Sequence, residues 1–108
     1  RTDTPLQALV LLNDPEYVAA ARHLAALAMK EDETTEERID LIFRRATSRR
    51  PDATEREILT TRFQTALAKY QQDTKATQAL VASDSAEHAA LTLVASIVLN
   101  LDEVITRE

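Results

Sequence analysis

Apolar residues recur three and four positions apart along most of the chain, which is the spacing of one face of an α-helix. A first helix is predicted to begin at Thr4 and Pro5 and to end near Leu12, because threonine caps free amides and proline needs no donor at the first helical position. Asp14 and Pro15 predict a second helix start. The inward positions of this second helix are expected to be Tyr17, Val18, Ala21, Leu24, Ala25 and Ala28.

Two capping-box patterns predict the next two helices. Thr34 with Glu37 follows the acidic loop at residues 31–33 and opens a helix whose inward face can be read from its periodicity. Thr54 with Glu57 repeats the pattern after Pro51. The inward residues of the two helices are expected to be Ile39, Ile42, Phe43 and Ala46, followed by Leu59, Phe63, Ala66, Leu67 and Tyr70.

The last third of the chain predicts one short helix and one long helix. Asp73 or Thr74 starts the short helix, which ends near Val81, and Asp84 with Glu87 caps the long one. A helix with one thin polar line on an apolar cylinder is expected to lie at the centre of the domain. The residues of that polar line recur at every fourth position and are His88, Thr92, Ser96 and Asn100.

These patterns predict an all-α fold, a compact bundle of about six helices that forms a single domain over residues 1–108. The chain contains no glycine, which is the residue best suited to tight hairpin turns, and its 44% hydrophobic content is sufficient for one core. Asn13 and Asn100 each interrupt an apolar run, and asparagine tolerates the left-handed end of a helix. We therefore expect the N- and C-terminal helices to pack together. The chain begins with Arg1 and carries no leader, so we expect a piece of a longer polypeptide.

Composition and charge exclude several classes of function. A net charge of -5 argues against nucleic acid as a partner, and the absence of glycine and cysteine excludes glycine-rich phosphate loops, thiolate metal sites and covalent haem attachment. The longest apolar stretch, residues 89–101, is shorter than the ~20 residues of a membrane span. His23 and His88 lie in different predicted helices, so they do not form a His-x-x-x-His zinc motif. We expect neither a metal nor another cofactor in this domain.

The basic residues that attract attention are Arg44, Arg45, Arg49 and Arg50. Four neighbouring arginines could bind phosphate or an acidic polymer, although no aromatic residue lies among them to stack on a base. Arginines near a helix C-terminus also complement its negative end, and the acidic segment at residues 31–37 could neutralise them. A structural role is the favoured interpretation of this cluster.

Paired carboxylates are a weaker candidate for chemistry. Asp14 and Glu16 could meet Asp102 and Glu103 if the two ends of the chain touch, and paired carboxylates can perform acid-base catalysis. Helix capping explains these residues more simply. No arrangement typical of a serine nucleophile is present either, so we do not expect this domain alone to be an enzyme.

A set of polar residues at the two ends of the chain forms the remaining candidate site. These residues could satisfy broken helix ends as a structural network, or they could face a preceding domain. The set consists of Arg1, Thr2, Asp3, Thr4, Asn13, Asn100, Asp102 and Arg107.

Two sequence motifs near the ends of the chain carry a family resemblance. Residues 1–13 read RTDTPLQALVLLN and residues 99–107 read LNLDEVITR, with Thr92-Leu-Val-Ala between them. In these motifs the chain resembles the planctomycete-specific C-terminal domain of unknown function, the PSD-type domain of secreted planctomycete proteins that also contain cytochrome-c-like domains. It departs from that pattern at Leu91, where tryptophan is common, and at Val104, where an aromatic residue is common. The family has no established activity, so the resemblance transfers no catalytic residue.

The resemblance implies a periplasmic or extracellular location and upstream neighbours that include cytochrome-c-like domains. Together with the predicted fold, it suggests a helical scaffold or interaction module that docks onto upstream domains of a larger exported protein. The alternative is a contribution to an active or ligand-binding site of a secreted multidomain enzyme, related to carbohydrate or redox chemistry.

Overall fold

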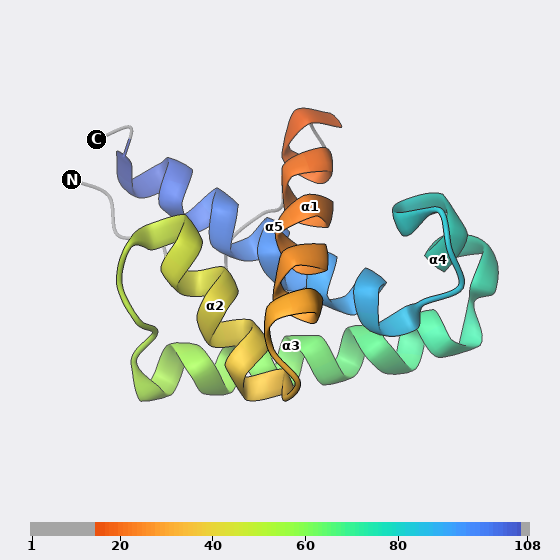
Figure 1. The fold of residues 1–108 in the computed structure, drawn as a ribbon, viewed down its shortest axis with the longest axis horizontal. Coiled ribbons are helices and arrows are strands. Elements are labelled where there is room, and N and C mark those ends of the chain that lie inside the picture. Colours follow the sequence, from red (N-terminus) through yellow and green to blue (C-terminus); the bar gives the residue numbers. More distant parts are fainter. Residues whose placement is uncertain (1–14, 107–108) are drawn as a thin grey trace.

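Five α-helices, four of which surround the fifth, make up the described part of the chain (Figure 1). The computed structural model describes the backbone of residues 15–106 and the side chains of residues 15–101. No strand occurs in this part of the chain. The helices are α1 (Pro15–Glu31), α2 (Thr35–Thr47), α3 (Ala53–Gln72), α4 (Thr74–Val81) and α5 (Ala86–Thr106).

The all-α prediction is confirmed, but the number of helices differs from about six because residues 15–106 form five. The helix predicted at residues 4–12 lies outside the described residues, as does the expected packing between the two ends of the chain. No described helix has the length and apolar character needed to cross a membrane.

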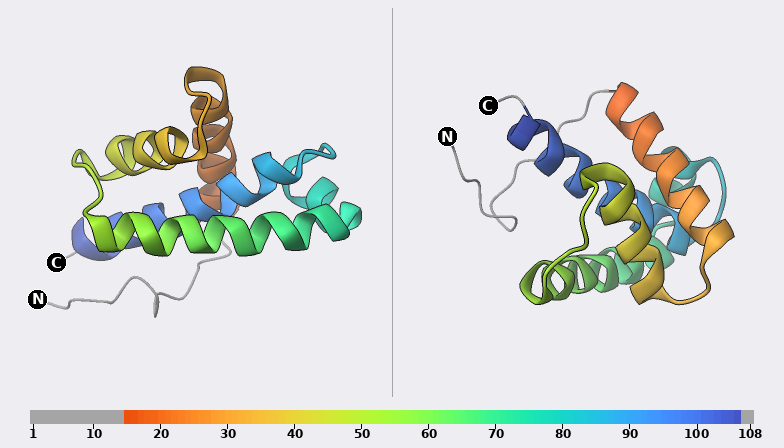
Figure 2. Two further views of the ribbon diagram at one scale, coloured as in Figure 1. Left: turned by 90° about the horizontal axis from the view of Figure 1, so that it is seen from below. Right: turned by 60° about the vertical axis from the view of Figure 1, so that its left-hand side comes forward.

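Helix α5 is the centre of the fold, as the sequence pattern predicted, and it contacts each of the other four helices. Helix α3 runs along the long axis of the molecule, whereas α1 crosses α5 steeply (Figures 1 and 2). This enclosure buries nearly the whole circumference of α5. Its buried apolar residues are Ala89, Ala90, Leu91, Val94, Ala95, Ile97, Val98 and Leu101.

Two buried residues of the polar line on α5 form hydrogen bonds to the preceding helical turn. The Thr92 hydroxyl donates to the His88 carbonyl oxygen at 2.7 Å, and the Asn100 amide donates to the Ser96 carbonyl oxygen at 2.6 Å. Thr92 and Asn100 are only 1% and 2% exposed, so these bonds avoid the free-energy penalty of leaving buried polar atoms unpaired. The helix therefore continues through Asn100, and the predicted break at that residue is wrong.

Small side chains allow α1 to approach α5. Ala21, Ala25 and Ala28 lie three and four positions apart on one face of α1, and each is 0% exposed. Tyr17 and Val18 are only half-buried, so the inward face predicted for this helix is most complete in its second half. The predicted inward residues of α2 and α3 are confirmed, with Ile39, Ile42, Phe43, Leu59, Phe63 and Ala66 buried, and Ala46, Leu67 and Tyr70 packed against them.

The N-terminal caps of the helices agree with the sequence only in part. Thr34 caps α2 as predicted, with its hydroxyl oxygen accepting the Glu37 N–H at 3.2 Å. For α3, the predicted pair of Thr54 and Glu57 is wrong. Asp52 accepts the Glu55 N–H at 2.7 Å, and Glu55 accepts the Asp52 N–H at 2.9 Å. An aspartate directly after Pro51 starts the helix two residues earlier than the threonine could.

The remaining two helices begin at neighbouring polar residues. Asp73 caps α4 by accepting the Ala76 N–H at 3.0 Å, which agrees with the prediction. For α5, Ser85 rather than Asp84 is the cap, because its hydroxyl oxygen accepts the His88 N–H at 3.1 Å. Asp84 instead accepts a hydrogen bond from the Gln78 amide at 2.6 Å.

Two helices end in the left-handed conformation without glycine. Ser48 ends α2 with a φ of 65°, and Ala82 ends α4 with a φ of 58°. The N–H of each residue donates to a carbonyl oxygen four residues earlier, at 2.9 Å in both cases. These hydrogen bonds offset the steric cost that a Cβ atom carries in this conformation.

We predict that Asp52→Ala lowers the free energy of unfolding by about 0.5–2 kcal/mol, because it removes the cap of α3. Thr54→Ala in the first turn of the same helix should change it by less than about 0.5 kcal/mol. Urea unfolding followed by circular dichroism would measure both values. A larger loss for Thr54→Ala than for Asp52→Ala would show that the cap is misassigned.

We also predict that Ala82→Gly raises the free energy of unfolding by roughly 0.5–1 kcal/mol, because glycine adopts a positive φ without steric conflict. Ala79→Gly, at an exposed position inside α4, is the matched control and should lower it by a similar amount. Thermal unfolding of the two variants should give shifts of opposite sign. Destabilisation by both substitutions would contradict the prediction.

Candidate anion-binding surface

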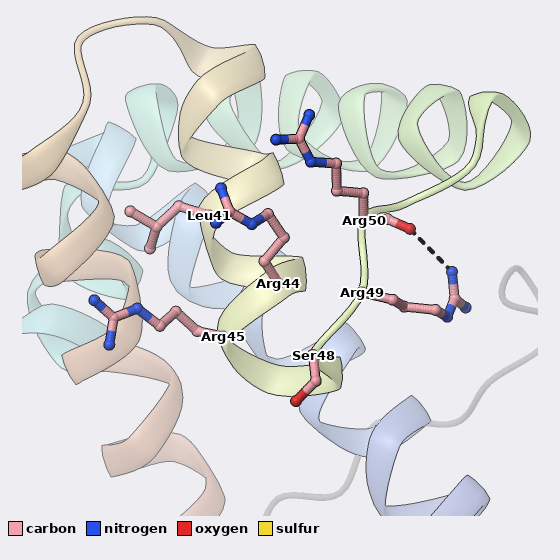
Figure 3. Close-up of a pocket in the computed structure, with 6 residues that line it drawn as sticks. All are labelled: Leu41, Arg44, Arg45, Ser48, Arg49 and Arg50. Atoms are coloured by element: carbon pink, nitrogen blue, oxygen red, sulfur yellow. Dashed lines mark hydrogen bonds between the residues drawn. The ribbon is translucent and has the colours of Figure 1, made fainter.

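Four arginines from the end of α2 and the following connection surround one surface hollow of about 450 Å³ (Figure 3). The structure thus brings together the basic cluster that the sequence singled out. We call this region the arginine surface. The residues that line it are Leu41, Arg44, Arg45, Ser48, Arg49 and Arg50.

The hydrogen bonds of the connection explain why the chain turns sharply at this place. The Ser48 N–H donates to the Arg44 carbonyl oxygen at 2.9 Å and closes the last turn of α2. The Thr47 hydroxyl donates to the Phe43 carbonyl oxygen at 2.7 Å and accepts the Arg49 N–H at 3.4 Å. Pro51 is buried and cannot continue the helix. Arginines of the helix and of the connection consequently lie around the same hollow.

Arg49 stabilises the corner between the end of α2 and the beginning of α3. Its Nη1 and Nη2 atoms each lie 2.8 Å from a carboxylate oxygen of Glu55, and its guanidinium lies over the Phe43 ring, 4.8 Å from the centroid. It also donates to the Arg50 carbonyl oxygen at 3.2 Å. Figure 3 shows its side chain extending away from the other three arginines. Arg49 therefore connects the buried face of α2 to the capping box of α3.

The same contact changes the ionisation of both partners. The hydrogen bond from Arg49 holds the pKa of Glu55 below its usual value, although partial burial acts in the opposite direction. The hydrogen bond to Glu55 likewise raises the pKa of Arg49. Both side chains therefore stay charged in the folded protein at neutral pH, which keeps the corner intact.

The other three arginines of the surface, Arg44, Arg45 and Arg50, are exposed. Within the described residues, none of their guanidinium groups forms an ion pair or a hydrogen bond. Four of the 13 lysines and arginines fall within residues 41–51, whereas none of the 18 acidic residues does. The surface is therefore a concentrated positive region on a chain of net negative charge.

The acidic segment at residues 31–37 does not neutralise this region, contrary to the structural interpretation of the sequence. The segment lies at the opposite end of α2, a helix of 13 residues and about 20 Å. Glu36 lies 4.0 Å from Arg56, and the Asp32 carbonyl oxygen accepts a hydrogen bond from Arg38 at 2.8 Å. Asp40 is also occupied, because it forms two hydrogen bonds with Arg56, at 3.1 and 3.2 Å.

Most of the predicted polar network at the chain ends lies outside the described side chains, and its role stays a prediction. Asn100 is the described member. It is 2% exposed and bonded to Ser96, so it cannot line a cleft that is open to solvent. The residues outside the described side chains are Arg1, Thr2, Asp3, Thr4, Asn13, Asp102 and Arg107.

The two histidines meet at a shallow hollow between α1 and α5, which sequence reasoning did not anticipate. His23 is exposed and His88 is half-buried, and both line the hollow together with Arg22. The His88 Nε2 atom lies 3.0 Å from the Arg22 carbonyl oxygen, so this nitrogen carries the proton. Within the described residues, no group of three His, Cys, Asp or Glu side chains could hold a metal ion.

Comparison with protein families gives a match over more than half of the chain. The family PSD1, described as a protein of unknown function (DUF1553), matches residues 1–63. This range includes α1, α2 and the arginine surface, and it confirms the family resemblance carried by the sequence motifs. No curated protein and no solved structure matches the chain.

We predict that Glu55→Gln makes the stability of the domain less sensitive to acid. Because the pKa of Glu55 is lowered in the folded state, its pairing with Arg49 stabilises the fold above the usual glutamate pKa. That contribution is lost as the pH falls from the usual glutamate pKa through the lowered value. The wild-type protein should therefore lose up to about 1 kcal/mol more than Glu55→Gln over this range.

Urea unfolding at several pH values would measure this difference. The matched control is Glu57→Gln, which removes an exposed carboxylate from the same helix and should retain the wild-type pH dependence. Equal acid sensitivity of Glu55→Gln and the wild-type protein would contradict the role given to the Arg49 contact.

Proposed function

We propose that this chain, which belongs to the PSD1 family of proteins of unknown function, acts as a helical interaction module. In this proposal the module docks onto upstream domains of its parent protein through the arginine surface. The observation that supports it most strongly is the exposure of Arg44, Arg45 and Arg50 without an acidic partner among the described residues. Like charges gathered in one hollow repel one another, and an acidic partner would relieve that repulsion.

The chemistry of the surface favours an acidic protein as the partner over nucleic acid. The hollow has no exposed aromatic side chain on which a base could stack, because Phe43 is 0% exposed beneath Arg49. The net charge of -5 also opposes binding to a long polyanion. A protein with a local acidic patch needs no aromatic stacking and carries less negative charge than a long polyanion.

The rigid base of the surface also supports a role in recognition. The Arg49 contacts with Glu55 and Phe43, together with the two hydrogen bonds between Arg56 and Asp40, join α2 to α3. A surface held in position loses less conformational entropy when a partner binds.

We further propose a location outside the cytoplasm and cytochrome-c-like upstream domains, and this part rests on the sequence resemblance alone.

We predict saturable binding when the 108-residue chain is titrated into the remainder of its parent polypeptide in a calorimeter. Replacing Arg44, Arg45 and Arg50 together by glutamine should weaken binding roughly 3- to 100-fold, because each exposed charge pair contributes about 0.2–1 kcal/mol. Binding should also weaken between 0.01 and 0.1 M salt, where the Debye length falls from about 30 to about 10 Å.

The control for this experiment is a second triple variant, in which Lys30, Lys69 and Lys75 are replaced by glutamine. It removes the same charge from exposed positions on α1, α3 and α4, away from the arginine surface, and should bind like the wild-type chain. Absence of binding between two folded pieces would reject the docking proposal. Equal weakening by the two triple variants would show that net charge, and not this surface, controls the association.

A further inference from the structure

We infer that the arginine surface recognises an acidic peptide segment, with at least two carboxylate side chains bound to Arg44, Arg45 and Arg50. This inference rests on the proposed docking function and adds the chemical nature of the segment that is bound. Three features of the hollow support it: the use of its backbone amides, the arrangement of its guanidinium groups, and the presence of Leu41 in its lining.

The backbone of the hollow offers little to a compact phosphate group. Protein phosphate sites commonly use several free backbone N–H groups, often at a helix N-terminus. Here the N–H groups of Ser48 and Arg49 already donate to Arg44 and Thr47, and Pro51 has no N–H group. The hollow also lies at the C-terminal end of α2, where the helix dipole opposes a concentrated negative charge. Recognition therefore depends mainly on the guanidinium groups.

The guanidinium groups are arranged for separate carboxylates. Arg44 and Arg45 come from the last turn of α2, and Arg50 comes from the connection that follows it. Figure 3 shows the side chains of these three residues spreading apart on one side of the connection, while Arg49 points the other way. Each guanidinium can bind one carboxylate through two parallel hydrogen bonds. Carboxylates spaced along a peptide can reach such separated groups, whereas one small anion cannot bind all three in this way.

The lining of the hollow is suited to a peptide, which has apolar groups as well as charges, rather than to a ligand that offers charged groups only. Leu41 is half-buried in the lining, beside the stems of the arginine side chains. Aliphatic stems and a leucine provide apolar contact for the methylene groups of glutamate or for a neighbouring apolar residue. Arg49 cannot serve as a fourth binding group without giving up Glu55, so the site has three free cationic groups.

The test uses the 108-residue chain and a fluorescently labelled tetraglutamate peptide, with tetraglutamine as the uncharged probe. Fluorescence anisotropy should show saturable binding of tetraglutamate and none of tetraglutamine. The glutamine variant of Arg44, Arg45 and Arg50 should bind tetraglutamate at least threefold more weakly. The glutamine variant of Lys30, Lys69 and Lys75 should retain wild-type affinity.

Competition with inorganic phosphate separates the peptide from a small anion. Phosphate should displace tetraglutamate no better than sodium chloride does at equal ionic strength. Stronger displacement by phosphate would overturn the inference and identify a phosphate site. Equal loss of affinity in the two triple variants would overturn it as well, because the binding would then be non-specific.

The outcome can be distinguished from that of the docking experiment. If the parent polypeptide binds through the three arginines but tetraglutamate does not bind, the docking proposal stands and the acidic-segment inference fails. If tetraglutamate binds but the parent polypeptide does not, the chemical nature of the ligand stands and the docking partner is wrong.

Discussion

The enclosure of α5 by the other four helices is the constraint on which the rest of the structure depends. The chain has only two phenylalanines and no tryptophan, so few large side chains are available to fill space between helices. Its core instead combines branched aliphatic residues with alanines on α1 and α5, which let the helices approach closely. Polar residues face this core where a backbone acceptor is within reach, as the carbonyl oxygens of His88 and Ser96 are for Thr92 and Asn100.

The corner between α2 and α3 shows how a structural contact and a recognition surface can share neighbouring residues. Arg49 neutralises Glu55 and covers Phe43, which secures the beginning of α3. The remaining arginines of the corner face solvent, and their positions follow from the way α2 ends at Ser48. Within this basic cluster, stability and binding therefore depend on different residues. Arg49 stabilises the corner, and the other three arginines remain available to a ligand.

The sequence predicted the helical class, the buried faces of α2 and α3 and the central position of α5, because these features follow from periodicity and burial. It predicted caps less well where several polar residues compete, as in the choice of Asp52 over Thr54. The pattern Asp52-Ala-Thr-Glu55 was present in the sequence and could have identified that cap.

The candidate site was predictable as a cluster but not in its detail. Four arginines within seven residues are visible in the sequence, yet the pairing of Arg49 with Glu55 depends on a turn whose geometry no local pattern specifies. The acidic segment at residues 31–37 is near the arginines in the sequence but lies at the other end of α2, so it does not reach them in space. The meeting of His23 and His88 is tertiary, since the two residues lie on helices at opposite ends of the described chain.

The uneven placement of charge also affects how the molecule would meet an acidic body in solution. Its overall charge of -5 is repelled by such a body, while the corner at the end of α2 is attracted to it. These two forces act at different points of the molecule. Together they produce a torque that rotates the end of α2 toward the acidic body. Encounters in other orientations would be repelled before contact. The excess of acidic residues elsewhere therefore restricts productive encounters to those in which the arginine surface faces the acidic body.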